Sequence, residues 1–399
     1  MLAVMMLRHI LEVSMPESIE ITFVENDKDI LPILHSVSRQ LIELNKLQAV
    51  KIVCAIQEDN FITDFSSSSY DIVICNPPYA KITKKSREAE KMAYVVYGQP
   101  NLYALFAVKA VSLLNEGGQY VFITPRSWTS GNYFVKIREF LFNTITIRKI
   151  HLFNYRENVF SNEDILQETM IWSGSKGKGK EEIIRISTSE NDGFKETSSI
   201  DVPFFEIVSH NEDKYLLLPL KEEDYELLKS MNGLRDTFDS LGYVFRTGPV
   251  VEFRKQELLS PTRTPQAIPM FRAANVKDGK FVFPANTEKA QYIDTTKEPL
   301  LRFENTPTIL VKRLSAKEEK RRLQCCAYIP IPSEPYVSLE NHVNYLTKKD
   351  GGSLTEDEVS WAFSVISSEK YDRYFRMING STQVNAKDLN MLPVTRRLI

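Results

Sequence analysis

The sequence predicts an α/β protein with a second, less regular domain. Strand-like and helix-like segments alternate over the first 175 residues, which is typical of a doubly wound sheet. From about residue 200 the segments become irregular and are interrupted by prolines, as in "SPTRTPQAIP" and "CCAYIPIPSEP". We therefore place an α/β domain at residues 1–200 and a mixed α+β domain at residues 201–399. A chain of 399 residues is long enough for both.

The elements of the first domain follow from short apolar runs and from amphipathic stretches. "DIVIC" at 71–75 is a β-branched apolar run, which is typical of a strand buried on both faces. Gly117-Gly118 is predicted to end the helix at 101–116. We predict helices at 30–45, 101–116 and 134–143, and strands at 19–27, 50–59, 71–75, 119–125, 146–153, 168–175 and 181–187.

Composition narrows the class of protein. The net charge of −2 gives no global positive field, so a nucleic-acid partner would have to be met by local basic patches. The four cysteines form no CxxC pair, which favours reduced thiols in a cytosol. No apolar run approaches about 18 residues and no signal peptide is recognisable, so we expect a soluble cytoplasmic protein. The five histidines show no ligand spacing, and we predict no metal.

The stretch "DIVICNPPY" carries the chemistry. In an open α/β sheet ligands bind at the carboxyl ends of strands, where Asn76 to Tyr79 are expected. Asn76 offers an amide oxygen and Pro77 a carbonyl, while Pro78 stiffens the loop. Two fixed acceptors suit a planar amino group, and Tyr79 offers a face on which an extruded base can stack. The alternative interpretation is a plain rigid turn.

This stretch resembles the [DNS]-P-P-[YFW] motif of amino-group methyltransferases, most closely the gamma-class N6-adenine DNA methyltransferases of type II restriction–modification systems. "NLYALFAVKAVSLLNEGGQYVFITPRSW" and "ENVFSNEDILQETMIW" are similar to the segments that follow that motif. The resemblance implies a Rossmann-like sheet, S-adenosylmethionine as cofactor, and catalytic roles for Asn76, Pro77, Pro78 and Tyr79. It also implies that Phe160 packs on the target base, although an aromatic residue is usually a core residue.

The resemblance assigns the cofactor site to acceptors at strand ends. Glu25 in "FVEND" lies where the class binds the ribose hydroxyls, and Asp59 in "QEDNF" lies where it binds the adenine amino group. Asn76 is expected to border the cofactor as well. Either acid is alternatively a solvated loop residue.

One part of the family pattern is missing. The family begins with a strand and a glycine-rich loop resembling D-P-x-x-G-x-G, whereas "MLAVMMLRHI" resembles the helix that follows that loop. We therefore expect the first, central strand to be missing from this chain, through a truncated reading frame or because the segment lies on another polypeptide. We expect the chain alone to bind S-adenosylmethionine weakly or not at all, which calorimetry tests.

Double-stranded DNA is the partner that the resemblance implies. "AKITKKSREAEKMAYVVYGQP" reads as a loop that orders on a ligand, and Lys81, Lys84 and Lys85 in it are candidates for phosphate contacts or for a solvated face. The second domain resembles a target-recognition domain. Its most basic cluster is a candidate phosphate site or an exposed helix face paired with Glu318 and Glu319. The cluster consists of Lys312, Arg313, Lys317, Lys320, Arg321 and Arg322.

Amides of the second domain are candidates for reading adenine edges, or for capping turns. They are Asn341, Asn344, Gln383 and Asn385, whereas His342 is expected to be a structural hydrogen-bonding residue.

The leading prediction is a site-specific DNA adenine-N6 methyltransferase that acts by direct displacement on an extruded adenine. A rival interpretation is an amino-group methyltransferase acting on a protein glutamine or on RNA, against which the large second domain argues. A third is a catalytically dead DNA-binding or specificity module. An in-frame glycine-rich motif upstream of the start codon would favour the enzyme over the dead module.

Overall fold

The computed structural model forms two compact units, Met1–Leu217 and Leu218–Ile399. The predicted boundary after residue 200 falls inside strand β8 (Glu196–Pro203), and the division into functional domains at 1–200 and 201–399 stays a prediction. The structure describes residues 2–14, 16–45, 50–66, 69–153, 168–177, 183–189, 196–209, 211–316, 319–380 and 382–395.

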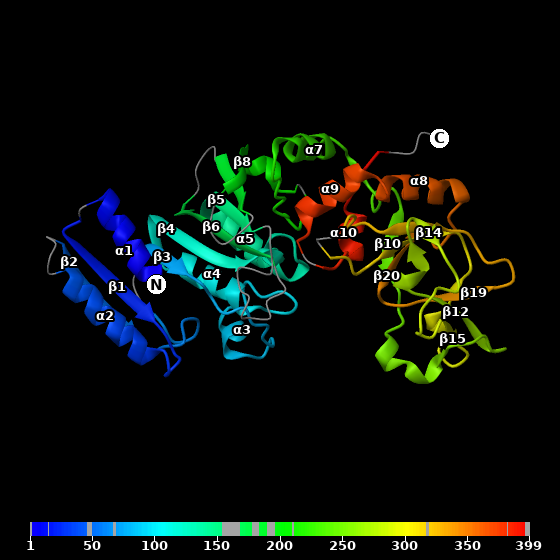
Figure 1. Cartoon of the computed structure of the whole chain (residues 1–399), viewed down its shortest axis with the longest axis horizontal. Coiled ribbons are helices and arrows are strands. Elements are labelled where there is room, and N and C mark those ends of the chain that lie inside the picture. Colours follow the sequence, from blue (N-terminus) through cyan, green and yellow to red (C-terminus); the bar gives the residue numbers. More distant parts are fainter. Residues whose placement is uncertain are drawn as a thin grey trace. The chain divides into compact units, whose positions relative to one another are not determined.

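The first unit begins with a small layer of two helices and two strands, as Figure 1 shows. Strands β1 (Ser18–Val24) and β2 (Lys51–Gln57) pair in parallel, from Ser18 opposite Lys51 to Val24 opposite Gln57. Helices α1 (Leu2–Val13) and α2 (Leu31–Asn45) cover them. The shared core is small and consists of Leu7, Ile21, Leu41 and Ile52. Among the described residues, β1 and β2 pair with no other strand.

A separate six-stranded sheet forms the rest of the first unit. Its order is β3-β4-β6-β5-β7-β8, and β3–β4 and β5–β7 are parallel whereas the other neighbours are antiparallel. The sheet is therefore mixed, with β6 inserted against the direction of β4 and β5. The strands are β3 (Tyr70–Cys75), β4 (Leu114–Pro125), β5 (Ile145–Phe153), β6 (Thr169–Lys176), β7 (Ile183–Ser189) and β8; the helices are α3 (Arg87–Lys91), α4 (Leu102–Ser112), α5 (Val135–Thr144) and α6 (Phe204–Ile207).

The predicted helix stop at Gly117-Gly118 is wrong. Helix α4 already ends at Ser112, and both glycines belong to β4. A Cβ atom on Gly118 would lie 3.0 Å from the carbonyl oxygen of Tyr70, so glycine lets β4 approach the start of β3. The register between these strands shifts at that point.

Aromatic side chains fill the core beside β4 and β6. Trp172 packs against Phe122 and Trp128, with ring centroids 4.9 Å apart in both pairs. The indole nitrogen of Trp172 donates to Thr124 Oγ1 at 3.0 Å. Arg138 in α5 is fully buried and donates to the carbonyls of Trp128 at 2.8 Å and of Gly131 at 2.9 Å. These contacts fix the segment that follows β4.

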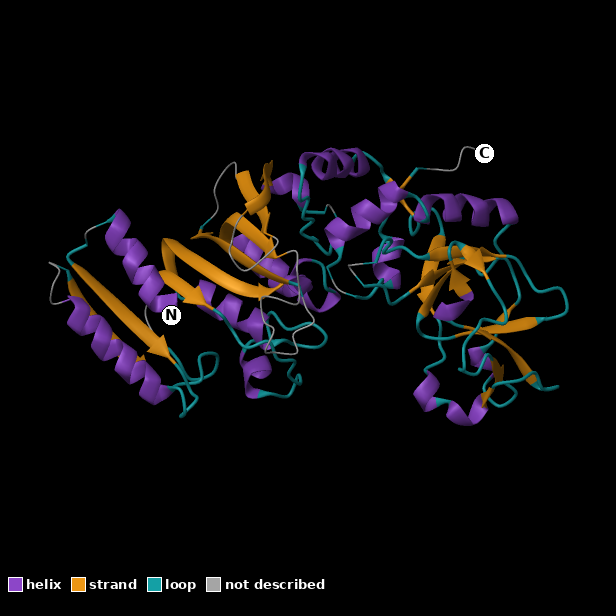
Figure 2. Cartoon of the chain, viewed as in Figure 1, coloured by secondary structure: helices purple, strands orange, loops and turns teal. Residues whose placement is uncertain are grey.

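The second unit combines two larger sheets with helices (Figure 2). A four-stranded sheet has the order β10-β20-β17-β18, and a five-stranded sheet has the order β11-β15-β12-β19-β16. The helices are α7 (Glu222–Asn232), α8 (Glu356–Ile366), α9 (Glu369–Ile378) and α10 (Ala386–Asn390). The strands of the two sheets are β10 (Tyr243–Thr247), β11 (Leu259–Ser260), β12 (Ala267–Phe271), β15 (Tyr292–Asp294), β16 (Phe303–Glu304), β17 (Thr308–Lys312), β18 (Cys325–Tyr328), β19 (Tyr336–Leu339) and β20 (Val343–Lys348). Two further pairs are β9 (Asp236–Thr237) with β21 (Pro393–Val394), and β13 (Val276–Lys277) with β14 (Lys280–Phe281).

Candidate active site

The Asn-Pro-Pro-Tyr segment leaves the carboxyl end of β3, as the sequence predicts. Asn76 and Pro78 are exposed, Pro77 is buried and Tyr79 is half-buried. The carbonyl of Pro77 accepts no hydrogen bond from any residue that the structure describes. The exposed Asn76 side chain is therefore followed directly in the chain by a backbone oxygen that has no donor among the described residues.

Tyr79 is fixed by its hydroxyl and by its ring. The hydroxyl lies 3.1 Å from each of two acceptors, Asn76 Oδ1 and the carbonyl of Ile123, which compete for its single proton. Its ring meets the edge of Tyr103, with centroids 6.1 Å apart and planes at 81°. Tyr103 is buried, which raises its pKa, and it is hydrogen-bonded to Ser127 Oγ at 2.8 Å. The phenol is therefore one possible donor to the Asn76 oxygen that an incoming amine would use, with the Ile123 carbonyl as its alternative acceptor.

Glu25 and Asp59 come to one edge of the β1–β2 pair. The strands are parallel and in register at Val24 and Gln57, so their carboxyl ends meet. Glu25 Oε1 accepts from the backbone N–H groups of Asn26 at 2.8 Å and Asp27 at 2.9 Å. Asp59 is half-buried and has no hydrogen bond or ion pair with another described residue. One carboxylate is held by its own turn, and the other is available to a ligand.

Sequence reasoning missed Asn60, which joins this edge to α3. Its Oδ1 accepts from the N–H groups of Ile62 at 3.0 Å and Thr63 at 3.2 Å, and its Nδ2 donates to Glu88 Oε1 at 2.9 Å. Asp-Asn after a strand is a signal for a side-chain-capped turn. Nothing local in the sequence indicates the contact with Glu88, because it lies 28 positions away.

A buried ion pair also went unpredicted. Arg126 follows β4 and Glu168 precedes β6. Arg126 Nη1 lies 3.0 Å from Glu168 Oε2, and the two side chains are 5% and 2% exposed, respectively. The Arg126 N–H also donates to the Glu168 carbonyl at 2.7 Å. Phe160, the predicted second aromatic of the site, lies outside the described residues.

The three lysines after the motif are exposed. Lys81, Lys84 and Lys85 form no ion pair or side-chain hydrogen bond with any described residue. The segment that carries them was predicted as a loop, but it contains helix α3, whose first turn is capped by Ser86 Oγ accepting from the Ala89 N–H at 3.3 Å.

The basic cluster of the second unit is not a helix face. Lys312 ends β17, and the described residues between β17 and β18 form no helix. Arg313 donates to the Asn341 carbonyl at 3.1 Å, and Arg321 donates to the Ser367 carbonyl. Arg322 is 1% exposed. Its guanidinium lies over the ring of Phe375, 5.9 Å from the centroid, and this burial contradicts a contact with a DNA phosphate.

The predicted base-reading amides are largely occupied. Asn344 is fully buried; its Oδ1 accepts from Thr247 Oγ1 and its Nδ2 donates to the Val384 carbonyl, both at 2.8 Å. Direct base reading by Asn344 is therefore contradicted. Asn385 is at the N-cap position of α10 but makes no side-chain capping hydrogen bond there; its Nδ2 donates to Asp388 Oδ2 at 3.1 Å. Gln383 is exposed.

Two further searches cover the same described residues. They contain no group of three or more His, Cys, Asp or Glu side chains placed to hold a metal ion. No helix among them is long and apolar enough to cross a membrane.

Comparison with known proteins places this geometry in a family. Residues 18–160 match the family model described as Eco57I restriction-modification methylase. The type II methyltransferase M.PstI of Providencia stuartii is 32% identical over 369 residues, which cover 88% of this chain and 73% of the relative. The chain belongs to the type II methyltransferase family.

The share of the relative's own length that this type II methyltransferase matches differs from one relative to the next. M.BsuBI of Bacillus subtilis is 32% identical over 327 residues, covering 81% of this chain and 65% of the relative. Among solved structures, the type IIG restriction endonuclease BpuSI is similar with a TM-score of 0.42 and 14% identity, over 99% of this chain and 58% of that chain. The matched family model includes the Asn-Pro-Pro-Tyr segment, Glu25 and Asp59.

Proposed function

We propose that this chain is the methyl-transferring part of a restriction–modification system and that it methylates adenine N6 in double-stranded DNA. The observation that supports this most directly is the pair of acceptors at the end of β3. The Asn76 amide is exposed, and the Pro77 carbonyl has no donor among the described residues. An amino group that donates a hydrogen bond to each of these oxygens gains lone-pair density on its nitrogen. That nitrogen is then the nucleophile that methyl transfer requires.

Tyr79 has two proposed roles. Its ring, held edge-on to Tyr103, offers a face to the extruded adenine. Its hydroxyl, which lies within hydrogen-bonding distance of Asn76 Oδ1, exchanges with the adenine amino group when the base enters. The exchange replaces one hydrogen bond by another, so little free energy is lost in freeing the acceptor.

S-adenosylmethionine is the cofactor that we propose, and it supplies an electrophilic methyl group when bound. The two carboxylates fit S-adenosylmethionine as hydrogen-bond acceptors. Asp59 has no described partner, and Glu25 keeps a second carboxylate oxygen that its own turn does not use. Both acids can accept hydrogen bonds from ribose hydroxyls or from the adenine amino group.

The Asn76→Ala variant tests the function. Transfer of labelled methyl groups to DNA should fall about 10²–10³-fold, the size of effect seen when one preorganised electrostatic contact is removed. DNA affinity should stay nearly unchanged. Asn115→Ala is the matched control, because this exposed asparagine donates to Asp71 at the opposite end of β3.

The product identifies the substrate. Nucleoside mass spectrometry of the methylated DNA should show N6-methyladenine. Unchanged turnover in Asn76→Ala, or methyl incorporation into RNA or a protein glutamine in place of DNA, would overturn the assignment.

A further inference from the structure

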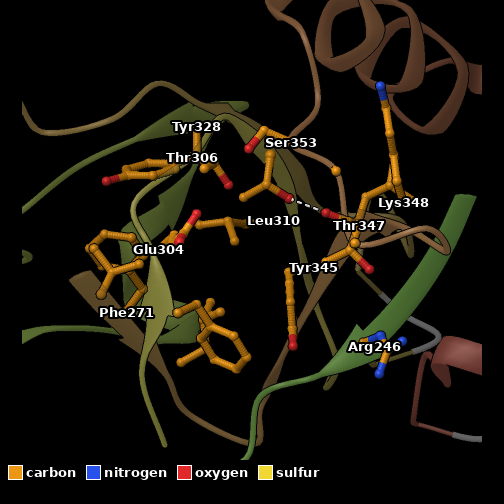
Figure 3. Close-up of a pocket in the computed structure, with 17 residues that line it drawn as sticks. Arg246, Phe271, Glu304, Thr306, Leu310, Tyr328, Tyr345, Thr347, Lys348 and Ser353 are labelled. Carbon is orange, nitrogen blue, oxygen red and sulfur yellow. Dashed lines mark hydrogen bonds between the residues drawn. The ribbon is translucent and has the colours of Figure 1, made fainter. Parts of the chain in front are cut away.

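A pocket of about 360 Å³ opens in the second unit between its two larger sheets (Figure 3). Strands β17, β18 and β20 of one sheet and β12, β16 and β19 of the other contribute its lining. The volume lies in the range of about 300–1,000 Å³ that small-molecule sites occupy. None of the residues predicted from the sequence to contact the target base or the cofactor lines this pocket.

Aromatic rings form the walls. Phe303 and Tyr345 lie with centroids 5.0 Å apart, and Phe271 and Tyr328 with centroids 4.8 Å apart. Phe271, Tyr328 and Tyr345 also belong to the hydrophobic core of the unit, so neighbouring side chains hold their rings in place. Fixed aromatic walls favour a flat, apolar-faced ligand, which loses little freedom on entering.

Two charged groups of opposite sign border the pocket. Figure 3 shows Glu304 on the side of Phe271 and Arg246 on the other side, beyond Tyr345. Arg246 in β10 pairs across the sheet with Tyr345. Burial raises the pKa of Tyr345, and the positive charge of Arg246 opposes that rise. Neither the Glu304 carboxylate nor the Arg246 guanidinium forms a hydrogen bond or ion pair with another described residue.

The charges restrict the ligand further. Lys348, which also lines the pocket, is paired with Glu358 at 3.0 Å, so Arg246 is the cation left for a ligand among the described lining residues. The Glu304 carboxylate disfavours a phosphate or another anion in the same space. A neutral flat ring with a donor on one part of its edge and an acceptor on another matches this arrangement.

We propose that this pocket binds a nucleobase. A carboxylate accepts from the exocyclic amine of a base, and a guanidinium donates to a base carbonyl or ring nitrogen. Aromatic side chains stack on the faces of bases without regard to sequence. The expected source is a DNA base displaced from the duplex at a position other than the methylated adenine, which rests on the proposed function. A free nucleoside offers the same chemistry and is the other source.

Two probes distinguish these sources. Duplexes carrying 2-aminopurine at single positions in and around the methylation site, mapped beforehand by sequencing of methylated DNA, report a displaced base by a severalfold rise in fluorescence on addition of the full chain. The four free deoxynucleosides, titrated in saturation-transfer NMR, report binding without DNA. A rise in 2-aminopurine fluorescence at the target adenine alone supports only the proposed function. A rise at another position supports base binding in the pocket.

Variants assign the signal to the pocket. Thr306→Trp places a large side chain in the lining and should abolish the non-target fluorescence rise or the nucleoside signal. Glu304→Gln should weaken binding about tenfold for bases that carry an amino group. Lys349→Gln is the control, because Lys349 pairs with Asp239 at 2.9 Å and does not line the pocket.

The outcomes separate cleanly. A non-target rise lost in Thr306→Trp supports a displaced DNA base, and nucleoside binding lost in that variant supports a free nucleoside. Absence of both signals, or signals that Thr306→Trp and Glu304→Gln leave unchanged, would overturn the proposal. Circular dichroism of Thr306→Trp and the milder Glu304→Gln variant keep a folding defect from being mistaken for lost binding.

Discussion

Tyr79 combines a stacking face with a hydroxyl that lies within hydrogen-bonding distance of the Asn76 oxygen and of the Ile123 carbonyl. Tyr79→Phe keeps the ring and removes the competing donor, so we expect turnover within about fivefold of the parent, since one such hydrogen bond is worth about 1 kcal/mol net. Tyr79→Ala removes the stacking face and should cost about 1–3 kcal/mol, or about 5–150-fold in transfer. Steady-state methyl transfer to DNA measures both. Equal losses in the two variants would contradict the stacking role.

Cys75 directly precedes the motif, and burial raises the pKa of its thiol to about 12. At pH 8 this thiol is protonated, and thiols react as thiolates. We expect iodoacetamide to leave Cys75 unmodified in the folded chain at pH 8 and to modify it in denaturant, as read by peptide mass spectrometry. Cys326, whose pKa burial also raises to about 12, serves as the internal comparison. Rapid folded-state alkylation of Cys75 would contradict its burial.

At the residue scale, the sequence predicts where a residue lies along a strand better than it predicts which side chains surround that residue. Asn76 lies at a strand end because its β-branched neighbours and the two prolines determine that locally. The surroundings of Arg322 and Asn344 depend on Phe375 and on Thr247 and Val384, which are distant in the chain. No local pattern distinguishes an arginine over a buried ring from one that faces DNA, so both predictions failed.

At the element scale, Gly174 in β6 allows three strands to pack closely. A Cβ atom there would lie 2.7 Å from the hydroxyl of Tyr120 and closer still to the carbonyl oxygen of Thr146. Gly174→Ala should destabilise the first unit by about 1–3 kcal/mol through overpacking. Urea unfolding, followed by the fluorescence of Trp128 and Trp172 in a Trp361→Phe background, measures the loss.

The control for this prediction is the adjacent Ser173→Ala, since Ser173 already carries a Cβ atom and is only half-buried. It should change the free energy of unfolding by less than about 0.5 kcal/mol. Similar losses for the two variants would show that the close approach at Gly174 is not the cause.

The order of the strands in the six-stranded sheet is the part of the fold that the hydrophobic pattern of the sequence does not predict. Apolar runs located β1, β2, β3 and β5, because each is a local feature. The insertion of β6 between β4 and β5 depends on pairing across positions such as Phe122 and Trp172, and hydrophobic patterns do not specify which partner a strand takes. The mostly polar strand β8 has only two β-branched apolar residues, Ile200 and Val202, and was not predicted.

At the scale of the whole molecule, acid should weaken the second unit. Burial raises the pKa of Glu358, but hydrogen bonds from the Thr355 backbone, Lys348 and Tyr243 outweigh it and hold the pKa below its ordinary value. A carboxyl with a lowered folded-state pKa stabilises the fold above its unfolded pKa of about 4.3, and this contribution is lost as the pH falls through the folded value.

We therefore expect the urea midpoint of the second unit, read by Trp361 fluorescence, to fall between pH 7 and pH 3.5. Trp361 is a suitable reporter because its ring lies 5.4 Å from that of Tyr243, the hydroxyl donor to Glu358. Glu358→Gln should flatten this pH dependence, whereas the exposed Glu356→Gln in the same helix should leave it unchanged. An equal slope in parent and Glu358→Gln chains would refute the assignment.

The separation of β1–β2 from the larger sheet has a consequence for amide exchange. A two-stranded sheet is marginal on its own, and here a core of four buried side chains supports it, so its backbone should take up deuterium sooner than β4, β5 and β6. The carboxylates of Glu25 and Asp59 stand at the end of that early-opening layer. A molecule that bridges them should slow deuterium uptake across β1 and β2 while leaving the protected central strands unaffected.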